Sequence, residues 1–210
     1  MDEQKTRLFV SEINLMLDYC FFSFNQFNKV LKQIDTKEDY DLKCFWYYSQ
    51  TFITYAANLS KLLWASRNKN EKNEEFRKRK EFRDSLRQAL GISDKSILKN
   101  KKLRNRFEHL DEDLDTFKSG IVMSKNFGSV TGLINIAGED YDLSKEKQLR
   151  HYDQYTRTLY LYGEKMNLQE LYNEIKELSE KVAAYEEAND ELFYPITQQS
   201  GLRPNMQNDC

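Results

Sequence analysis

The first 90 residues of this 210-residue chain contain no glycine and no proline, and this absence is the strongest constraint on its fold. Gly91 is the first glycine, and the whole chain has only seven glycines and two prolines. These two residue types interrupt helices most strongly, and long stretches without them favour helical structure. The length suits one domain with a full hydrophobic core. We therefore expect a single, mainly α domain.

Two long helices are predicted before Gly91, over residues 3–34 and 38–66, because large apolar side chains recur in both near helical spacing. A turn and cap at Thr36–Asp39 separates them, so the two helices should form an antiparallel hairpin. The apolar positions are Leu8, Ile13, Leu17, Phe21, Phe24, Phe27, Val30 and Leu31 in the first helix, and Leu42, Phe45, Trp46, Phe52, Ile53, Ala56, Leu59, Leu63 and Trp64 in the second.

A polar connection at residues 66–73 leads to a short basic helix that passes through Phe82 and Leu86. Gly91 is expected to end this helix, because glycine readily adopts the left-handed conformation of a C-terminal cap. Ser93 or Ser96 can then cap a further helix that runs from about residue 94 to residue 118.

The periodicity changes over residues 121–162, where three glycines interrupt the pattern. Residues 157–162 read as a strand, and Asp153–Thr156 as the turn of a small hairpin that begins near Leu149. Asn167 is expected to cap a last helix with an apolar face, ending near Asn189. We expect residues 1–194 to form the domain, with its β element inside about 121–162, and residues 195–210 to be a flexible tail.

Charge is distributed unevenly along the chain. Residues 67–106 hold fifteen Lys and Arg against six Asp and Glu, a net charge of +9, whereas the chain as a whole carries −2. A basic stretch in an acidic protein suggests a docking site for a polyanion such as RNA. The alternative is a pair of helices whose charges are simply solvated.

No run of eighteen apolar residues and no signal-peptide pattern occurs, so we expect a cytoplasmic protein that has no contact with membranes. The three cysteines are widely spaced and form no Cys-x-x-Cys pair. We interpret Cys20 and Cys44 as small core residues. No motif indicates a cofactor, and we expect none.

The helix predicted over residues 94–118 carries the side chains of greatest chemical interest. Its apolar stripe consists of Leu103, Phe107, Leu110, Leu114 and Phe117. At about 100° per residue, His109 lies roughly 120° from this stripe and Asn105 roughly 160° from it. Both should face away from the core. Arg104 lies on the flank, from which its long side chain can reach them.

Other interpretations of these residues stay open. A histidine among charged neighbours on a helix surface is often merely solvated, and Arg104 with Glu108 forms an ordinary i, i+4 pair. His109, Glu112 and Asp113 could also hold a metal ion, although one His and two exposed carboxylates would bind it weakly.

The arrangement Arg104, Asn105, three further residues and His109 resembles the Arg-polar-x-x-x-His motif of HEPN domains. The resemblance extends to Leu103–Glu112 and to the order of the predicted helices. It implies an up-and-down bundle of about five helices, here with a small β-hairpin inserted before the last one. It also implies metal-independent RNA cleavage, with Arg104 and His109 as the catalytic pair and Asn105 as the residue that orients the site. The family's tyrosine two residues after the histidine is replaced by Asp111.

The resemblance further implies a homodimer that brings two motifs into one cleft. Asn105 and His109, with Leu98 on the same side of the predicted helix, suggest a two-fold contact. The expected function is therefore a dimeric ribonuclease, and the resemblance implies an antitoxin or a phage-defence partner. The alternatives are a non-catalytic HEPN-like module that binds RNA, a nucleotide or a protein, and a helical protein whose acidic last helix binds a partner.

Overall fold

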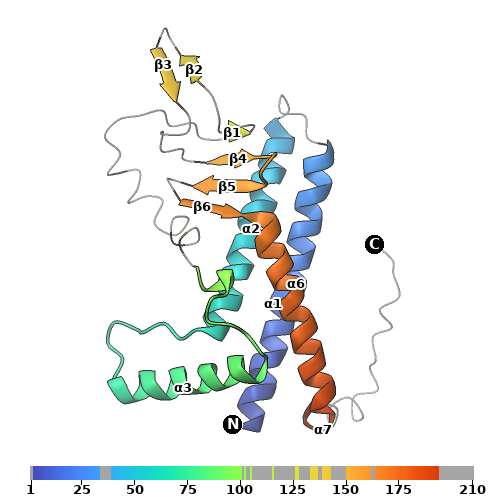
Figure 1. The fold of residues 1–210 in the computed structure, drawn as a ribbon, viewed down its shortest axis with the longest axis vertical. Helices are drawn as coiled ribbons and strands as arrows, with labels where there is room; N and C mark the ends of the chain where they lie inside the picture. The colour runs from blue at the N-terminus through green and yellow to red at the C-terminus, as the bar shows by residue number, and fades with distance from the viewer. Residues whose placement is uncertain are drawn as a thin grey trace.

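In the computed structural model the chain is mainly helical, with a small β element before its last long helix (Figure 1). This arrangement confirms the predicted fold class. The expected tail, residues 195–210, lies outside the part of the chain that the structure describes. The described residues are 2–33, 39–100, 102, 105, 115, 126–127, 133–136, 139–142, 150–161 and 164–193.

Helices α1 (Glu3–Gln33) and α2 (Asp39–Leu63) form the predicted antiparallel hairpin. Aromatic side chains fix the register between them: the ring centroids of Phe24 and Phe52 are 5.0 Å apart, and those of Phe27 and Phe45 are 5.1 Å apart. Such pairs contribute beyond the apolar area that they bury. Leu8 is an exception to the predicted core, because its side chain is exposed.

Helix α6 (Leu168–Ala188) packs along the hairpin and completes the core. The ring of its Tyr172 stacks on Phe24 with centroids 4.1 Å apart. The Asn167 side chain accepts hydrogen bonds from the amides of Gln169 and Glu170, which confirms the predicted cap. All five apolar residues predicted for one face of this helix are buried: Leu168, Leu171, Ile175, Leu178 and Val182. A short helix, α7 (Asp190–Phe193), follows.

Helix α3 (Asn73–Ala89) crosses the end of the bundle where α1 begins (Figure 1). Its Phe82 meets Phe9 of α1 edge to face, with centroids 5.0 Å apart. Gly91 has φ +63°, and the amides of Gly91 and Ile92 donate to the carbonyls of Gln88 and Arg87. This pair of hydrogen bonds is the Schellman motif, so the predicted glycine cap is confirmed.

The start of the next predicted helix was wrong. Residues Ile97–Lys99 form a single 3-10 turn, η1, in which the Leu98 amide donates to the Ser96 side chain. Asn100 follows in an extended conformation, and its side chain accepts a hydrogen bond from the amide of Lys102. The helical turn therefore begins after Asn100 rather than at residue 94. An asparagine side chain that accepts a hydrogen bond from an amide after it favours the start of a new helix over continuation of the turn before it.

A four-stranded sheet lies near the end of the bundle where α2 begins, and its order is β1-β4-β5-β6. β1 (Asn126–Phe127) runs parallel to β4 (His151–Asp153). β5 (Thr158–Leu161) and β6 (Glu164–Asn167) continue the sheet in antiparallel fashion. The β4–β5 hairpin was predicted, whereas β6 was not. A separate antiparallel pair consists of β2 (Leu133–Ile136) and β3 (Glu139–Asp142).

The sheet joins the helical core through Tyr152 of β4, whose ring lies against Phe27 and Phe45. Cys20 is buried in the same core, as predicted, but Cys44 is only half-buried. Of the helices that the structure describes, none combines the length and the apolarity needed to cross a bilayer.

Candidate functional site

Asn105 is the one member of the predicted catalytic motif among the described residues. It is helical and exposed, as are Lys102 and Asp115. The predicted outward direction of Asn105 is therefore confirmed. Arg104 and His109 lie outside the described residues, as do Glu112 and Asp113, the carboxylates of the alternative metal site.

The helical turn that carries Asn105 is anchored to the sheet at its start. The Lys102 ammonium lies 3.4 Å from the Glu164 carboxylate of β6, and Asn100 caps the turn. The amide of Ile97 in η1 donates to the Glu174 carboxylate of α6 over 3.3 Å. These contacts tie Lys102 to β6 and η1 to α6.

Leu98 does not serve the two-fold contact that the sequence suggested, because it is buried among Ala56, Ala57 and Leu171. The prediction assumed that residue 98 belonged to the motif helix. It belongs instead to η1, whose different rotation turns its side chain into the core.

A cavity of about 470 Å³ lies between η1 and strands β5 and β6. Asn100, Tyr160 and Lys165 line it, so it offers an amide, a half-buried aromatic ring and an exposed ammonium. Aromatic rings and ammonium groups are suited to nucleobases and phosphates respectively. Tyr155, in the β4–β5 turn, is largely exposed, whereas Tyr152 is buried.

The basic segment is partly neutralised by its own acidic residues. Over residues 67–100, eleven Lys and Arg face six Asp and Glu, a net charge of +5. Along α3, Lys78 pairs with Glu74, and Arg79 holds Glu71 through two bonds of 2.5 and 2.6 Å. Arg79 lowers the pKa of the Glu71 carboxyl by this hydrogen bonding. The segment is therefore less open to a polyanion than its residue count suggested.

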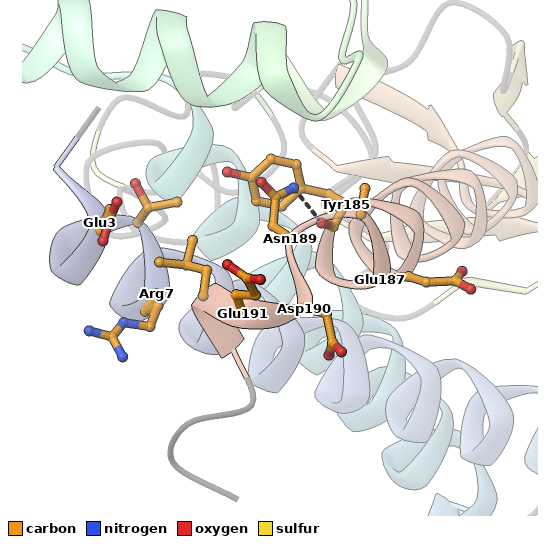
Figure 2. A pocket seen from close by; sticks show the side chains of 10 residues that line it. Glu3, Arg7, Tyr185, Glu187, Asn189, Asp190 and Glu191 are labelled. Atoms are coloured by element: carbon orange, nitrogen blue, oxygen red, sulfur yellow. Dashed lines mark hydrogen bonds between the residues drawn. The ribbon is translucent and has the colours of Figure 1, made fainter.

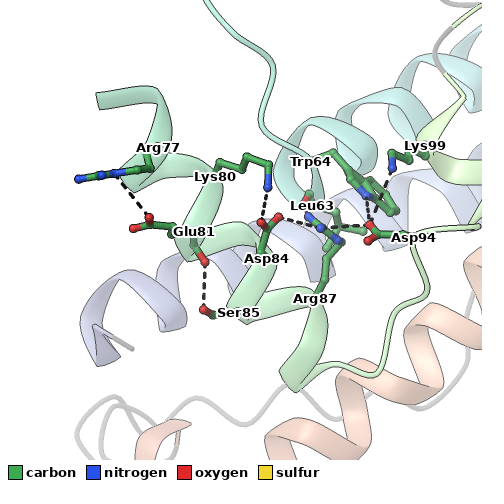
Figure 3. Close-up of polar contacts among 10 residues, drawn as sticks. All are labelled: Leu63, Trp64, Arg77, Lys80, Glu81, Asp84, Ser85, Arg87, Asp94 and Lys99. Carbon is green, nitrogen blue, oxygen red and sulfur yellow. Dashed lines mark hydrogen bonds and ion pairs between the residues drawn. The ribbon is translucent and has the colours of Figure 1, made fainter. Parts of the chain in front are cut away.

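Arg87 is the most buried cation of the segment, with 8% of its surface exposed. Its guanidinium donates to the Leu63 carbonyl at 2.7 Å and to Asp84 at 2.8 Å (Figure 3). It also reaches Asp94 at 3.2 Å and lies over the Trp64 ring, 5.2 Å from the centroid. Figure 3 shows how this one side chain joins the end of α2 to α3 and to the loop before η1.

A second cavity, of about 700 Å³, adjoins this Arg87 network. Lys80 and Lys99 also line it, and each contacts an aspartate of the network: Lys80 bonds Asp84 at 2.7 Å, and Lys99 lies 3.8 Å from Asp94. The hydrogen bond from Lys80 is the main cause that lowers the pKa of Asp84. The hydrogen bond from the Trp64 indole is the main cause that lowers the pKa of Asp94. The cations of this network are thus paired with carboxylates instead of being open to a ligand. We call Arg87 with Asp84 and Asp94 the Arg87 clamp.

A third cavity, of about 710 Å³, lies where α1 begins and α7 follows α6 (Figure 2). Four carboxylates line it, with Arg7 as the single cation among the lining residues: Glu3, Glu187, Asp190 and Glu191. Its charge opposes binding of a nucleic acid. The anionic cavity and the basic helix α3 are therefore two regions of opposite charge.

Two features of the Arg87 network are not predictable from the sequence pattern: the burial of Arg87 and the Trp64–Asp94 hydrogen bond of 3.3 Å. Both depend on how α2 and α3 cross, which spacing along one helix does not encode. His151 is a buried strand residue, and the centroid of its ring lies 5.8 Å from that of Tyr160. Within the described part of the chain, no cluster of three or more His, Cys, Asp or Glu could hold a metal ion.

Comparison of the chain with protein-family models, with curated proteins and with solved structures finds no match.

Proposed function

We propose that this protein is a metal-independent, HEPN-like endoribonuclease that acts as a homodimer. The observation that carries the proposal is the exposure of Asn105 on a helical turn. Since Asn105 and His109 are four residues apart, a helix that exposes one directs the other to the same side. Asn105 is therefore available to a substrate instead of serving the core, and the proposal extends this to Arg104 and His109.

The chemistry requires only side chains of the motif. His109 accepts the proton of a ribose 2′-hydroxyl, whose oxygen attacks the adjacent phosphorus. The bond from phosphorus to the 5′-oxygen breaks, which leaves a 2′,3′-cyclic phosphate. His109 of the second copy, in its protonated form, gives a proton to the departing 5′-oxygen. Arg104 stabilises the charge on the phosphate by paired hydrogen bonds, and Asn105 orients the site.

The cavity next to Asn100 supplies a place for the flanking nucleotide. Tyr160 offers a partly accessible ring and Lys165 an exposed ammonium at its edge. Base stacking and phosphate contact are each common in binding of single-stranded RNA. The cations of α3 that remain outside the Arg87 clamp add a general attraction for RNA.

The test is incubation of purified protein with mixed RNA in the presence of a chelator. The variants are Arg104→Ala, Asn105→Ala and His109→Ala, and Lys176→Ala serves as a control because this exposed lysine lies on α6. We expect loss of cleavage for the Arg104 and His109 variants and wild-type cleavage for the control. Cleavage that persists without Arg104 and His109 would refute the assigned residues, and dependence on a metal ion would refute the mechanism.

A second candidate is a non-catalytic HEPN-like module that binds RNA, a nucleotide or a protein. The pairing of the α3 cations with Glu71, Glu74 and Asp84 keeps this candidate open, because it leaves fewer cations for the RNA that a nuclease must hold. The same assay separates the two: retention of RNA in a filter-binding experiment without any cleavage would support the module. A role with an antitoxin or in phage defence follows from the family resemblance and is part of the proposal only in that sense.

A further inference from the structure

The four-stranded sheet has one polar face that the proposed catalytic motif does not use. In an antiparallel pair, residues directly opposite each other point to the same side of the sheet. His151 pairs with Tyr160, and Tyr160 pairs with Lys165, so these three side chains form a row across β4, β5 and β6. We call them the polar row. The residues that follow or precede them in the strands pack against the helical core instead: Tyr152, Leu159 and Met166.

The polar row borders the cavity of about 470 Å³ between η1, β5 and β6, which Tyr160 and Lys165 line. Another lining residue, Asn167, has a structural role that occupies its whole side chain. Its oxygen caps α6, and its nitrogen donates to the Thr156 carbonyl at 2.8 Å. The groups left for a ligand are therefore found at Tyr160, Lys165 and, on the η1 side, Asn100.

Lys165 differs from the cations of α3, because it has no carboxylate partner among the described residues. Glu164 precedes it in β6, points to the other side of the sheet and pairs with Lys102 at 3.4 Å. The Asn100 oxygen accepts from the Lys102 amide, so its side-chain nitrogen is the group that can donate to a ligand. The two walls of the cavity thus offer an ammonium and an amide donor, which suit the oxygens of a phosphate.

The ring of Tyr160 is half-buried and is held by its neighbour in the polar row. The ring of the buried His151 lies at 60° to it, with centroids 5.8 Å apart. A tilted contact of this kind supports the ring without lying flat on its face. A ring that is already fixed loses little conformational freedom when a base stacks on it, and such stacking tolerates every base.

We infer that this cavity binds one unpaired nucleotide of an RNA strand, with the base on the ring of Tyr160 and the adjacent phosphate on Lys165 and Asn100. The volume falls within the range of about 300–1,000 Å³ that small-ligand sites have. A base within a duplex has both faces covered by its neighbours, so it cannot stack on a half-buried ring. The inference rests on the proposed function for its ligand, RNA, but its residues lie outside the segment that resembles HEPN domains.

The cavity is also close to the motif along the chain. Asn100 lines the cavity and Asn105 belongs to the motif, so their α-carbons are at most about 18 Å apart. One strand of a few nucleotides can therefore reach both sites.

Charge limits how strongly the cavity attracts a phosphate. Glu170 of α6 also lines it, so the charges of Lys165 and Glu170 cancel. The attraction is therefore that of one ionic contact and not that of a basic patch. The inference consequently predicts two separable contributions to affinity: a phosphate contact that salt weakens and a stacking contact that salt leaves unchanged.

The experiment measures the anisotropy of a labelled single-stranded RNA of about eight nucleotides on the full chain, between about 50 and 200 mM salt. Every protein carries His109→Ala, so that cleavage does not interfere. Tyr160→Ala should weaken binding by about fivefold or more and leave the salt dependence unchanged. Lys165→Ala should also weaken binding and should lower the slope of log K against log salt by about 0.7, the value for one phosphate of a single strand.

The controls separate the cavity from the rest of the surface. Tyr155→Ala is the aromatic control, because that ring is 77% exposed in the β4–β5 turn and does not line the cavity. Tyr160→Phe keeps the ring and should keep the affinity, whereas Glu170→Gln should tighten binding by about twofold because it removes a like charge. Thermal unfolding verifies that each variant folds. Lys165 and Glu170 are exposed, so their variants test the site even if Tyr160→Ala unfolds.

Two further arms identify the form of the ligand. Tyr160→Ala should not change the affinity for the same RNA paired with its complement, and unlabelled uridine monophosphate or inorganic phosphate should displace the strand only at far higher concentration than unlabelled strand does. Unchanged affinity in both Tyr160→Ala and Lys165→Ala, an equal loss in Tyr155→Ala, an equal loss for the duplex, or displacement by uridine monophosphate at the concentration of the strand would overturn the inference.

The result is distinguishable from that of the cleavage assay. Loss of binding in Tyr160→Ala and Lys165→Ala without any cleavage by the wild type would support the nucleotide site and refute the nuclease. Cleavage by the wild type with unchanged binding in these variants would refute the nucleotide site alone.

Discussion

The guanidinium of Arg87 donates a hydrogen bond of 2.7 Å to the backbone carbonyl of Leu63, the last residue of α2. The last carbonyls of a helix have no partner within the helix, so this bond stabilises the end of α2. The same side chain bonds Asp84 of its own helix. One side chain of α3 therefore fixes the crossing of two helices that share few other polar contacts among the described residues.

Replacing Arg87 by alanine should destabilise the protein by about 1–3 kcal/mol, because it removes these hydrogen bonds and the packing on Trp64. Arg87→Lys should recover only part of the loss, since an ammonium cannot bond the carbonyl and both aspartates in the same planar geometry. Urea unfolding measures both values. Lys78→Ala, at an exposed ion pair on the same helix, is the control and should change stability by less than about 0.5 kcal/mol.

The two aspartates of the clamp should make stability depend on pH in the acidic range. Hydrogen bonding lowers the pKa of Asp84 and of Asp94 in the folded protein. The unfolded chain then takes up protons first, near the ordinary pKa of about 3.9, so the contribution is present above that pH and disappears as the pH falls through the folded values. Thermal unfolding between neutral pH and pH 3 measures it.

The double variant Asp84→Asn, Asp94→Asn should flatten that acidic part of the stability curve. Wild-type and variant curves that run parallel below pH 4 would contradict the assigned role of the two carboxylates.

The elements that could be predicted from sequence are those determined by local signals. The absence of helix breakers before Gly91 indicated the α1–α2 hairpin, and Asn167 marked the start of α6 because an asparagine side chain can accept from the first free amides. Both signals depend on a few neighbouring residues. Tertiary contacts need not be known to interpret them.

The predictions that were wrong depend on tertiary contacts. Leu98 was placed on the motif helix, but Asn100 interrupts the helical path and η1 turns Leu98 into the core. Leu8 was assigned to the core because it is large and apolar near helical spacing, yet it lies on the outer side of α1. A helix with two apolar stripes does not reveal from its own sequence which stripe meets the core. Only the positions of α2 and α6 decide that.

The glycine at position 91 should be replaceable at a small, purely conformational cost. A β-carbon there would meet no atom within 4 Å, so the penalty comes from φ +63° alone. Gly91→Ala should therefore lower the free energy of unfolding by about 1–2 kcal/mol, and Gly91→Asn by less, because asparagine tolerates the left-handed region. Chemical unfolding gives both numbers. Equal losses for the two variants would indicate a steric cause instead.

The two described cysteines should differ in reactivity toward a thiol reagent. Burial raises the pKa of the Cys20 thiol, which leaves almost no thiolate at neutral pH, and the side chain lies in the core. Cys44 on α2 is half-buried and has access to solvent. Because the thiolate is the reactive species, Cys44 should react with a disulfide reagent in the native protein and Cys20 only on unfolding. Measurement in a Cys210→Ser background isolates the two, and Cys44→Ser should then abolish native-state labelling. Rapid labelling of Cys20 in folded protein would show that α1 opens from the core far more readily than its packing against Phe52 and Tyr172 indicates.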